Sequence, residues 1–154
     1  MTDFLTRAIE LSNEGMASGQ GGPFGAVIVQ NGKIIAEGFN RVIATSDPTA
    51  HAEVVAIRRA CEALGQFDLS DCELYTSCEP CPMCLGAIYW ARPKKVYYAN
   101  TRHDAAAIEF DDSFIYDEIA APMSQRTIPF EHMPSDSAHA VFAEWAKKAD
   151  KTRY

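Results

Sequence analysis

Several features that would assign a chain to a broad class of protein are missing from these 154 residues. No apolar run approaches the ~20 residues that cross a bilayer, and no basic and apolar opening marks a signal peptide. Basic residues are in the minority, because 14 Lys and Arg stand against 21 Asp and Glu, for a net charge of -7. Binding along a phosphate backbone needs the opposite balance. We therefore expect a cytoplasmic protein with neither a membrane nor a nucleic acid as partner.

Cysteine is too unevenly placed for a disulfide framework. Five cysteines cannot all pair, and three of them, Cys78, Cys81 and Cys84, fall within seven positions. Without a secretory signal, this clustering favours metal binding in a reducing compartment. The other two, Cys61 and Cys72, are most simply small core residues. The sequence shows no repeat and no low-complexity linker, and its length suits a single domain over the whole chain.

Apolar periodicity and turn residues divide the chain into alternating helices and strands. We predict helices over about residues 3–17, 50–64, 82–91, 112–120 and 137–148. We predict strands over residues 24–30, 33–38, 73–77, 95–99 and 127–131. Asn31 and Gly32, between the first two strands, are a strong hairpin signal because both tolerate positive φ. The pattern indicates an α/β fold, a three-layer α/β/α sandwich around a mixed five-stranded sheet.

One pair of motifs carries recognisable chemistry. His51 and Glu53 stand near the start of one predicted helix, and Cys81 and Cys84 stand at the start of the next. Two cysteines three positions apart share a helix face, and a helix amino terminus favours the thiolate form. One imidazole and two thiolates are the ligand set of a catalytic zinc, which keeps a fourth position open. We predict one Zn²⁺ per subunit, held by His51, Cys81 and Cys84, with Glu53 free to move protons.

Other uses of these cysteines need weighing. Cys78, Cys81 and Cys84 have the spacing that begins an iron-sulfur ligand run, but Ile88 stands where the fourth cysteine is expected. A structural zinc would need a fourth protein ligand, which Cys78 could supply, although its place at a strand end favours a packed thiol. A redox pair at Cys81 and Cys84 would leave the histidine and the glutamate without a role. The remaining histidines are expected to be structural or solvated: His103, His132 and His139.

The joined motifs resemble the cytidine deaminase superfamily and, within it, the bacterial guanine deaminases. Residues 47–53 (DPTAHAE) and 75–84 (YTSCEPCPMC) carry the zinc motif of that family. Further segments are similar to the family, namely residues 21–29 (GGPFGAVIV), 85–93 (LGAIYWARP), 110–116 (FDDSFIY) and 126–130 (RTIPF). The resemblance implies hydrolysis of guanine to xanthine and ammonia, with Glu53 as both base and acid.

Substrate-binding residues are implied by the same resemblance. Asn40 matches an asparagine that binds the purine, although a turn residue is expected at such a position too. Asp112 matches an acidic residue that faces the substrate, with a helix cap as the alternative. Phe24 and Trp90 are candidates for stacking on the purine, as opposed to core packing. We include Ala52 among the residues lining the substrate, and Asp112 and Glu79 as candidate proton relays.

The carboxyl-terminal segment separates the competing functions. The resemblance implies a homodimer whose segments of about 135–154 exchange between subunits, with Tyr154 closing the partner's pocket. A tRNA adenosine deaminase shares the zinc motif and uses a basic tail on RNA, and other zinc-dependent nucleobase deaminases, such as cytosine deaminase, share the motif as well. The acidity of the chain and the segment 110–112 favour guanine. The basic residues that keep the RNA alternative open are Lys147, Lys148, Lys151 and Arg153.

Overall fold

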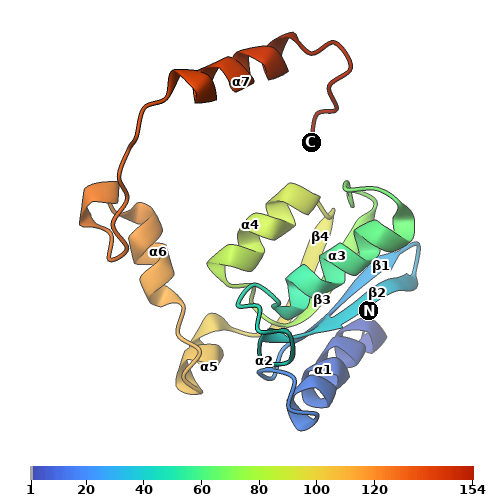
Figure 1. The fold of residues 1–154 in the computed structure, drawn as a ribbon. Coiled ribbons are helices and arrows are strands. Elements are labelled where there is room, and N and C mark those ends of the chain that lie inside the picture. The colour runs from blue at the N-terminus through green and yellow to red at the C-terminus, as the bar shows by residue number, and fades with distance from the viewer. Residues whose placement is uncertain (1) are drawn as a thin grey trace. The chain divides into compact units, whose positions relative to one another are not determined.

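The structure is a computed structural model that describes residues 2–154, with side chains from residue 4 onward. The chain divides into two compact units, Met1–Ser113 and Phe114–Tyr154. In the first unit the elements are α1 (Thr2–Ala17), β1 (Gly25–Gln30), β2 (Lys33–Phe39), α2 (Val42–Thr45), α3 (Ala52–Leu64), β3 (Cys72–Cys78), α4 (Pro82–Ala91), β4 (Lys95–Asn100) and α5 (Arg102–Ala107) (Figure 1). They are followed by α6 (Ser113–Ala120), η1 (Met123–Gln125) and α7 (Asp136–Lys147). None of the described helices has the length and apolar character needed to cross a membrane.

The strands of the first unit form one mixed sheet in the order β2-β1-β3-β4. β1 is antiparallel to both of its neighbours, whereas β3 and β4 are parallel. A parallel pair needs a crossover connection, and α4 supplies it. Asn31 and Gly32 adopt φ values of 51° and 73° between β1 and β2, so the predicted hairpin is confirmed. The α/β class and the mixed sheet are confirmed with it.

The fifth strand predicted over residues 127–131 is wrong, because the sheet formed by residues 2–154 has four strands. Pro129 has no N–H to donate to a strand ladder, and it interrupts a short run of β-favouring residues. The N–H and the hydroxyl of Thr127 both donate to the Glu118 carboxylate, at 2.9 Å each. The hydrogen bonds of Thr127 are therefore made locally and not along a sheet.

Helices cover both faces of the sheet. Ala26 and Ile28 of β1 pack in a core that includes the inner sides of α3 and α4. Val27 and Val29, which alternate with them, pack in a second core with Leu11 of α1. Figure 1 shows α1 on one side of the sheet and α3 and α4 on the other. The first unit therefore has the three layers expected of an α/β/α sandwich.

Gly38 in β2 allows α3 to approach the sheet closely. A Cβ on Gly38 would lie 2.7 Å from the Ala52 carbonyl oxygen and 2.8 Å from the Ala56 nitrogen, which is closer than a side-chain carbon can come to backbone. α3 carries His51 at its N-cap and Glu53 in its first turn. The absence of a side chain at Gly38 therefore helps to set the distance of both residues from the sheet.

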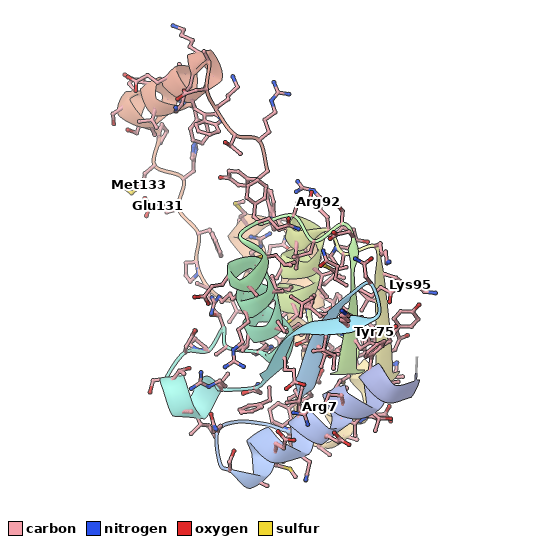
Figure 2. The ribbon with its side chains drawn as sticks, turned by 90° about the vertical axis from the view of Figure 1, so that its right-hand side faces the viewer. Arg7, Tyr75, Arg92, Lys95, Glu131 and Met133 are labelled. Atoms are coloured by element: carbon pink, nitrogen blue, oxygen red, sulfur yellow. The ribbon has the colours of Figure 1, made fainter. Side chains whose placement is uncertain are left out.

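Arg7 joins α1 to the edge strand β2 (Figure 2). Its Nε and Nη2 donate to the two carboxylate oxygens of Glu37 at 2.8 and 3.0 Å, and its Nη1 donates to Glu14 at 2.7 Å. Hydrogen bonding to the Arg7 guanidinium lowers the pKa of Glu37. The same bonds raise the pKa of Arg7 further above its ordinary value. The pair is a bidentate ion pair between two elements of the first unit.

The second unit contains apolar side chains without a core of its own. No residue from Phe114 to Tyr154 is buried in the single chain. Ser135 is the N-cap residue of α7, and its hydroxyl accepts from the Ala138 N–H at 3.4 Å. Val141, Phe142 and Trp145 of α7 are all exposed. Exposed apolar side chains gathered on one helix are available for burial against a partner surface.

Candidate active site

Two helix starts bring the predicted metal ligands together. His51 is the N-cap residue of α3, and Cys81 is the N-cap residue of α4, where Pro82 occupies the first helical position. Cys84 follows in the first turn of α4 and is buried. One ligand atom from each of His51, Cys81 and Cys84 lies within 4.8 Å of the other two. The predicted three-ligand group is therefore confirmed as a group that could hold a metal ion.

The distances within this group fit a tetrahedral zinc. His51 Nδ1 lies 3.5 Å from Cys81 Sγ and 3.6 Å from Cys84 Sγ. Bonds of about 2.0 Å to nitrogen and about 2.3 Å to sulfur, meeting at the tetrahedral angle, would separate these atoms by about 3.5 Å. The donor set is that of a catalytic zinc, and Nδ1 is the imidazole nitrogen that faces the sulfurs.

The start of α4 favours negative charge on Cys81. Its Sγ accepts from the Cys84 N–H at 3.5 Å. Hydrogen bonds from the Cys84 and His51 side chains lower the pKa of the Cys81 thiol to about 4, against the opposing effect of burial. The Cys81 thiolate in turn raises the pKa of His51. The pKa of Cys84 is raised because its thiol donates to that thiolate and is buried. Ligation of a metal by the two sulfurs requires both as thiolates, so metal binding releases protons.

Glu53 points from the first turn of α3 towards the same group. Its Oε2 lies 3.4 Å from Cys84 Sγ, and its Oε1 accepts from the Thr76 hydroxyl at 3.3 Å. Only 6% of the residue is exposed, and this burial raises the pKa of the carboxyl. A carboxyl group with a raised pKa beside metal ligands is suited to accepting a proton and giving it back.

The remaining cysteines are packed thiols. Cys78 Sγ donates to the Thr101 carbonyl at 3.6 Å, and burial raises the pKa of this thiol to about 11. Cys72 belongs to the core beneath α3, and Cys61 packs against that core. All five cysteines are free thiols. The core assignment of Cys72 is confirmed, Cys61 is partly buried against the core, and Cys78 lies outside the ligand group.

Asn40 follows β2 and is buried, with 6% of its surface exposed. Its Oδ1 accepts from the Val42 N–H at 3.1 Å, and its own N–H donates to the Phe24 carbonyl at 3.0 Å. A backbone N–H can bond only to the amide oxygen, so the orientation of the Asn40 amide is fixed. Gly21 lies against this amide, because a Cβ there would be 2.2 Å from Oδ1. Asn40 is therefore a turn residue that also presents its NH₂ as a donor.

Phe24 is held by an aromatic neighbour that is distant in sequence. Its ring centroid lies 5.0 Å from that of Phe110, and the two rings are nearly perpendicular at 86°. Gly22 lies against both rings, since a Cβ there would be 2.9 Å from Phe110 Cζ. An edge-to-face partner restricts the orientation of a ring, so the Phe24 ring is held in place, and Phe24 also packs against the core beneath α3. Ala52 is fully buried in the core.

Asp112 and Glu79 have different surroundings. The pKa of Asp112 is raised, first by burial and then by the negative charge of Cys81, so Asp112 lies within electrostatic reach of the ligand group. Glu79 accepts from the Arg102 N–H at 2.9 Å, which joins the loop before α4 to the start of α5. The side chain that caps α6 is that of Asp111, because its Oδ1 accepts from the Ser113 N–H at 2.9 Å.

Trp90 does not lie beside the ligands, and Tyr154 lies outside the first unit. Trp90 is nine positions after Cys81 on the same helix, about 13 Å along the axis, and 65% of it is exposed. Tyr154 belongs to the second unit and is exposed. The roles of Trp90 and Tyr154 stay predictions.

Sequence reasoning missed two residues of this site, Thr76 and Phe110. The signal for Thr76 is in β3, where Cys72 and Leu74 face the core under α3 and Thr76 continues the same alternating row. A hydroxyl in an apolar row needs a buried partner. No comparable local signal marks the contact of Phe110 with Phe24, because the two are far apart in sequence.

Comparison with known proteins agrees with this geometry. Residues 1–100 match the family model of the cytidine and deoxycytidylate deaminase zinc-binding region. The chain is 60% identical over 151 residues to a guanine deaminase of Bacillus subtilis, across 98% of this chain and 97% of the relative. It is 38% identical to a tRNA-specific adenosine deaminase of Aquifex aeolicus, across 82% of this chain and 81% of the relative.

Solved structures give the same assignment. An X-ray structure of guanine deaminase from Bacillus subtilis matches with a TM-score of 0.96 and 59% identity, covering 99% of this chain and 98% of that chain. A structure of guanine deaminase from Nitrosomonas europaea matches with a TM-score of 0.68 and 31% identity, covering 91% of this chain and 70% of that chain. The three-ligand group lies inside the matched family region, and the chain belongs to the zinc-binding cytidine and deoxycytidylate deaminase family.

Proposed function

We propose that the protein is a zinc-dependent guanine deaminase, which converts guanine and water to xanthine and ammonia for purine salvage or catabolism. One observation carries the proposal. The buried Glu53 carboxyl lies beside the ligand group in a chain that is 60% identical to a guanine deaminase along 98% of its length. The tRNA-specific adenosine deaminase relative is less similar, at 38% identity along 82% of the chain.

The chain supplies the ligands and the proton carrier. Bound by His51, Cys81 and Cys84, zinc supplies a Lewis acid that lets water ionise near neutral pH. Glu53 accepts the proton that water loses as its oxygen adds to carbon 2, and passes that proton to the adjacent ring nitrogen. Glu53 then takes the second proton of the added oxygen and gives it to the amine, so the C–N bond breaks and ammonia leaves. The raised pKa of Glu53 suits the steps in which it acts as an acid.

Substrate orientation is assigned to residues around Asn40. Its NH₂ group, fixed by the bond of Oδ1 to Val42, donates to an acceptor on the purine. The Phe24 ring stacks on the base, and a substrate contact of Ala52 is retained as part of the proposal, although its side chain is buried in the core. Asp112 accepts from the N–H groups of guanine, and its place within electrostatic reach of Cys81 supports this role. Proton relay is assigned to Asp112 or Glu79, and stacking by Trp90 is retained as part of the proposal.

The proposal extends to the assembly. The whole chain acts as one deaminase domain in a homodimer whose segments of about 135–154 exchange, with Tyr154 closing the partner's pocket. The unburied apolar side chains of α7 support this, because exchange would give them a surface to cover. The five free thiols suit a reducing cytoplasm.

A substrate panel tests the proposed function. Zinc-quantified protein is given free guanine, cytosine and a tRNA anticodon hairpin in parallel, and ammonia release is measured. We expect release from guanine, with much less from cytosine and the hairpin. Deamination of the hairpin adenosine with guanine left intact would replace the proposal by the tRNA alternative.

A further inference from the structure

Thr76 is a buried polar residue in an apolar row of β3. Its surface is 1% exposed, and the preceding residues of the row, Cys72 and Leu74, are fully buried beneath α3. Burying a hydroxyl is unfavourable unless its hydrogen bonds are made. The partners of Thr76 therefore indicate what this hydroxyl contributes.

The hydroxyl lies between Glu53 and the strand end that leads to the ligand loop. Thr76 Oγ1 is 3.3 Å from Glu53 Oε1 and 3.1 Å from the Cys78 carbonyl oxygen, and these two acceptors share its one proton. Cys81 comes three residues after Cys78. Thr76 thus connects the carboxyl group on α3 to the segment that carries a metal ligand.

The two oxygens of Glu53 have different neighbours. Oε1 is bonded to the Thr76 hydroxyl, whereas Oε2 lies 3.4 Å from Cys84 Sγ, on the side of the ligand group. A glutamate side chain has three rotatable bonds, and its terminal torsion is broad unless a partner restricts it. The hydrogen bond to Oε1 therefore helps to set which oxygen faces the ligands, together with the contact of Oε2 with Cys84 Sγ.

We propose that Thr76 is a positioning residue for deamination. Its hydroxyl holds Oε1 of Glu53 so that Oε2 stays directed at the place where protons are exchanged with water and substrate. A positioned proton acceptor speeds the chemical step more than it strengthens substrate binding, so the effect falls on kcat. The inference rests on the proposed function for the identity of the substrate only.

Two substitutions at this position separate the hydroxyl from the methyl group. Thr76→Val keeps the branched shape and removes the hydroxyl, whereas Thr76→Ser keeps the hydroxyl and removes the methyl. A hydrogen bond to a carboxylate is strong enough that Thr76→Val should lower kcat roughly 10- to 100-fold. KM for guanine should stay within about twofold. Thr76→Ser should recover most of the lost kcat.

Ser77 provides a matched control on the same strand. It is a buried residue whose Oγ accepts from the Gly25 N–H at 3.0 Å, and it faces the side of the sheet opposite to Thr76. Ser77→Ala should lower the thermal stability and leave kcat unchanged. Zinc per chain and thermal unfolding are measured for all three variants. A crystal structure of Thr76→Val should show the Glu53 carboxyl turned from its original orientation.

The outcomes divide clearly. A slow Thr76→Val with full zinc, and a Thr76→Ser near wild type, support the inference. It is overturned if Thr76→Val keeps the wild-type kcat, if Thr76→Ser is as slow as Thr76→Val, or if zinc is lost in step with activity. If the wild-type protein leaves guanine intact, the proposed function is rejected but the positioning role of Thr76 is not. That role is still decided by the orientation of Glu53 in the Thr76→Val crystal structure.

Discussion

Replacing Gly21 by alanine should displace Asn40 and weaken substrate binding. A Cβ on Gly21 would lie 2.2 Å from Asn40 Oδ1 and 2.5 Å from its carbonyl oxygen, so the amide must turn or the loop must move. Turning breaks the bond from the Val42 N–H, which is worth about 0.5–1.5 kcal/mol. Overpacking adds about 1–3 kcal/mol. Together these effects predict a loss of about 2–4 kcal/mol in unfolding free energy.

Gly86→Ala is the matched control for this substitution. Gly86 lies within α4, where a Cβ would meet no atom within 4 Å. Neither Gly21 nor Gly86 has a positive φ, so alanine suits both backbones. Gly86→Ala should therefore gain about 0.5–1 kcal/mol from helix propensity.

Thermal unfolding and guanine kinetics test the pair together. At about 2–4 °C per kcal/mol, Gly21→Ala should lower Tm by roughly 4–16 °C, and Gly86→Ala should raise it slightly. KM for guanine should rise in Gly21→Ala with zinc per chain unchanged, because Asn40 and not the ligand group is disturbed. A Gly21→Ala protein with wild-type Tm and wild-type KM would refute the reasoning.

Three further predictions concern other parts of the molecule. Glu53→Ala should keep one zinc per chain while turnover falls by about 10²–10⁴-fold, and parallel loss of zinc would make Glu53 structural instead. Because Arg7 lowers the pKa of Glu37, the stability from this pair should be fully present above the ordinary pKa of 4.5 and be lost as pH falls through the lowered value. Glu37→Gln should remove that dependence on acid. The change in unfolding free energy is about 1 kcal/mol or less, because solvent screens the pair. Identical acid unfolding curves for the wild type and Glu37→Gln would contradict this prediction. Removing Tyr154 should raise KM or slow product release in stopped-flow traces, whereas unchanged kinetics would exclude a role at the pocket.

The ligand group is the part of the site that sequence predicts best. Cys81 and Cys84 are three positions apart at a helix start that Pro82 marks, and this local geometry turns both sulfurs to one side. His51 also stands at a helix start. The sequence alone does not predict that α3 and α4 start close together. Their approach depends on packing against the sheet and on Gly38, which has no side chain to keep α3 away.

The partners of Glu53 and Phe24 show why the sequence alone does not predict Thr76 and Phe110 as residues of the site. The hydrogen bond from Thr76 joins residues 23 positions apart, and periodicity gives only the face on which Thr76 lies. Phe24 lies near the start of the first unit and Phe110 near its end, so the contact of their rings joins residues that are far apart in sequence. The wrong strand around Pro129 has the opposite cause, since local propensity favoured β structure while local hydrogen bonds decided the outcome.

The most direct test of the central claim is a zinc titration of guanine turnover. Metal-free protein is loaded with increasing amounts of Zn²⁺, and xanthine and ammonia are measured at each occupancy. Our account predicts equal amounts of the two products, at a rate that rises in proportion to bound zinc and levels off at one zinc per chain. Turnover that is complete without zinc, or no ammonia from guanine at full occupancy, would contradict it.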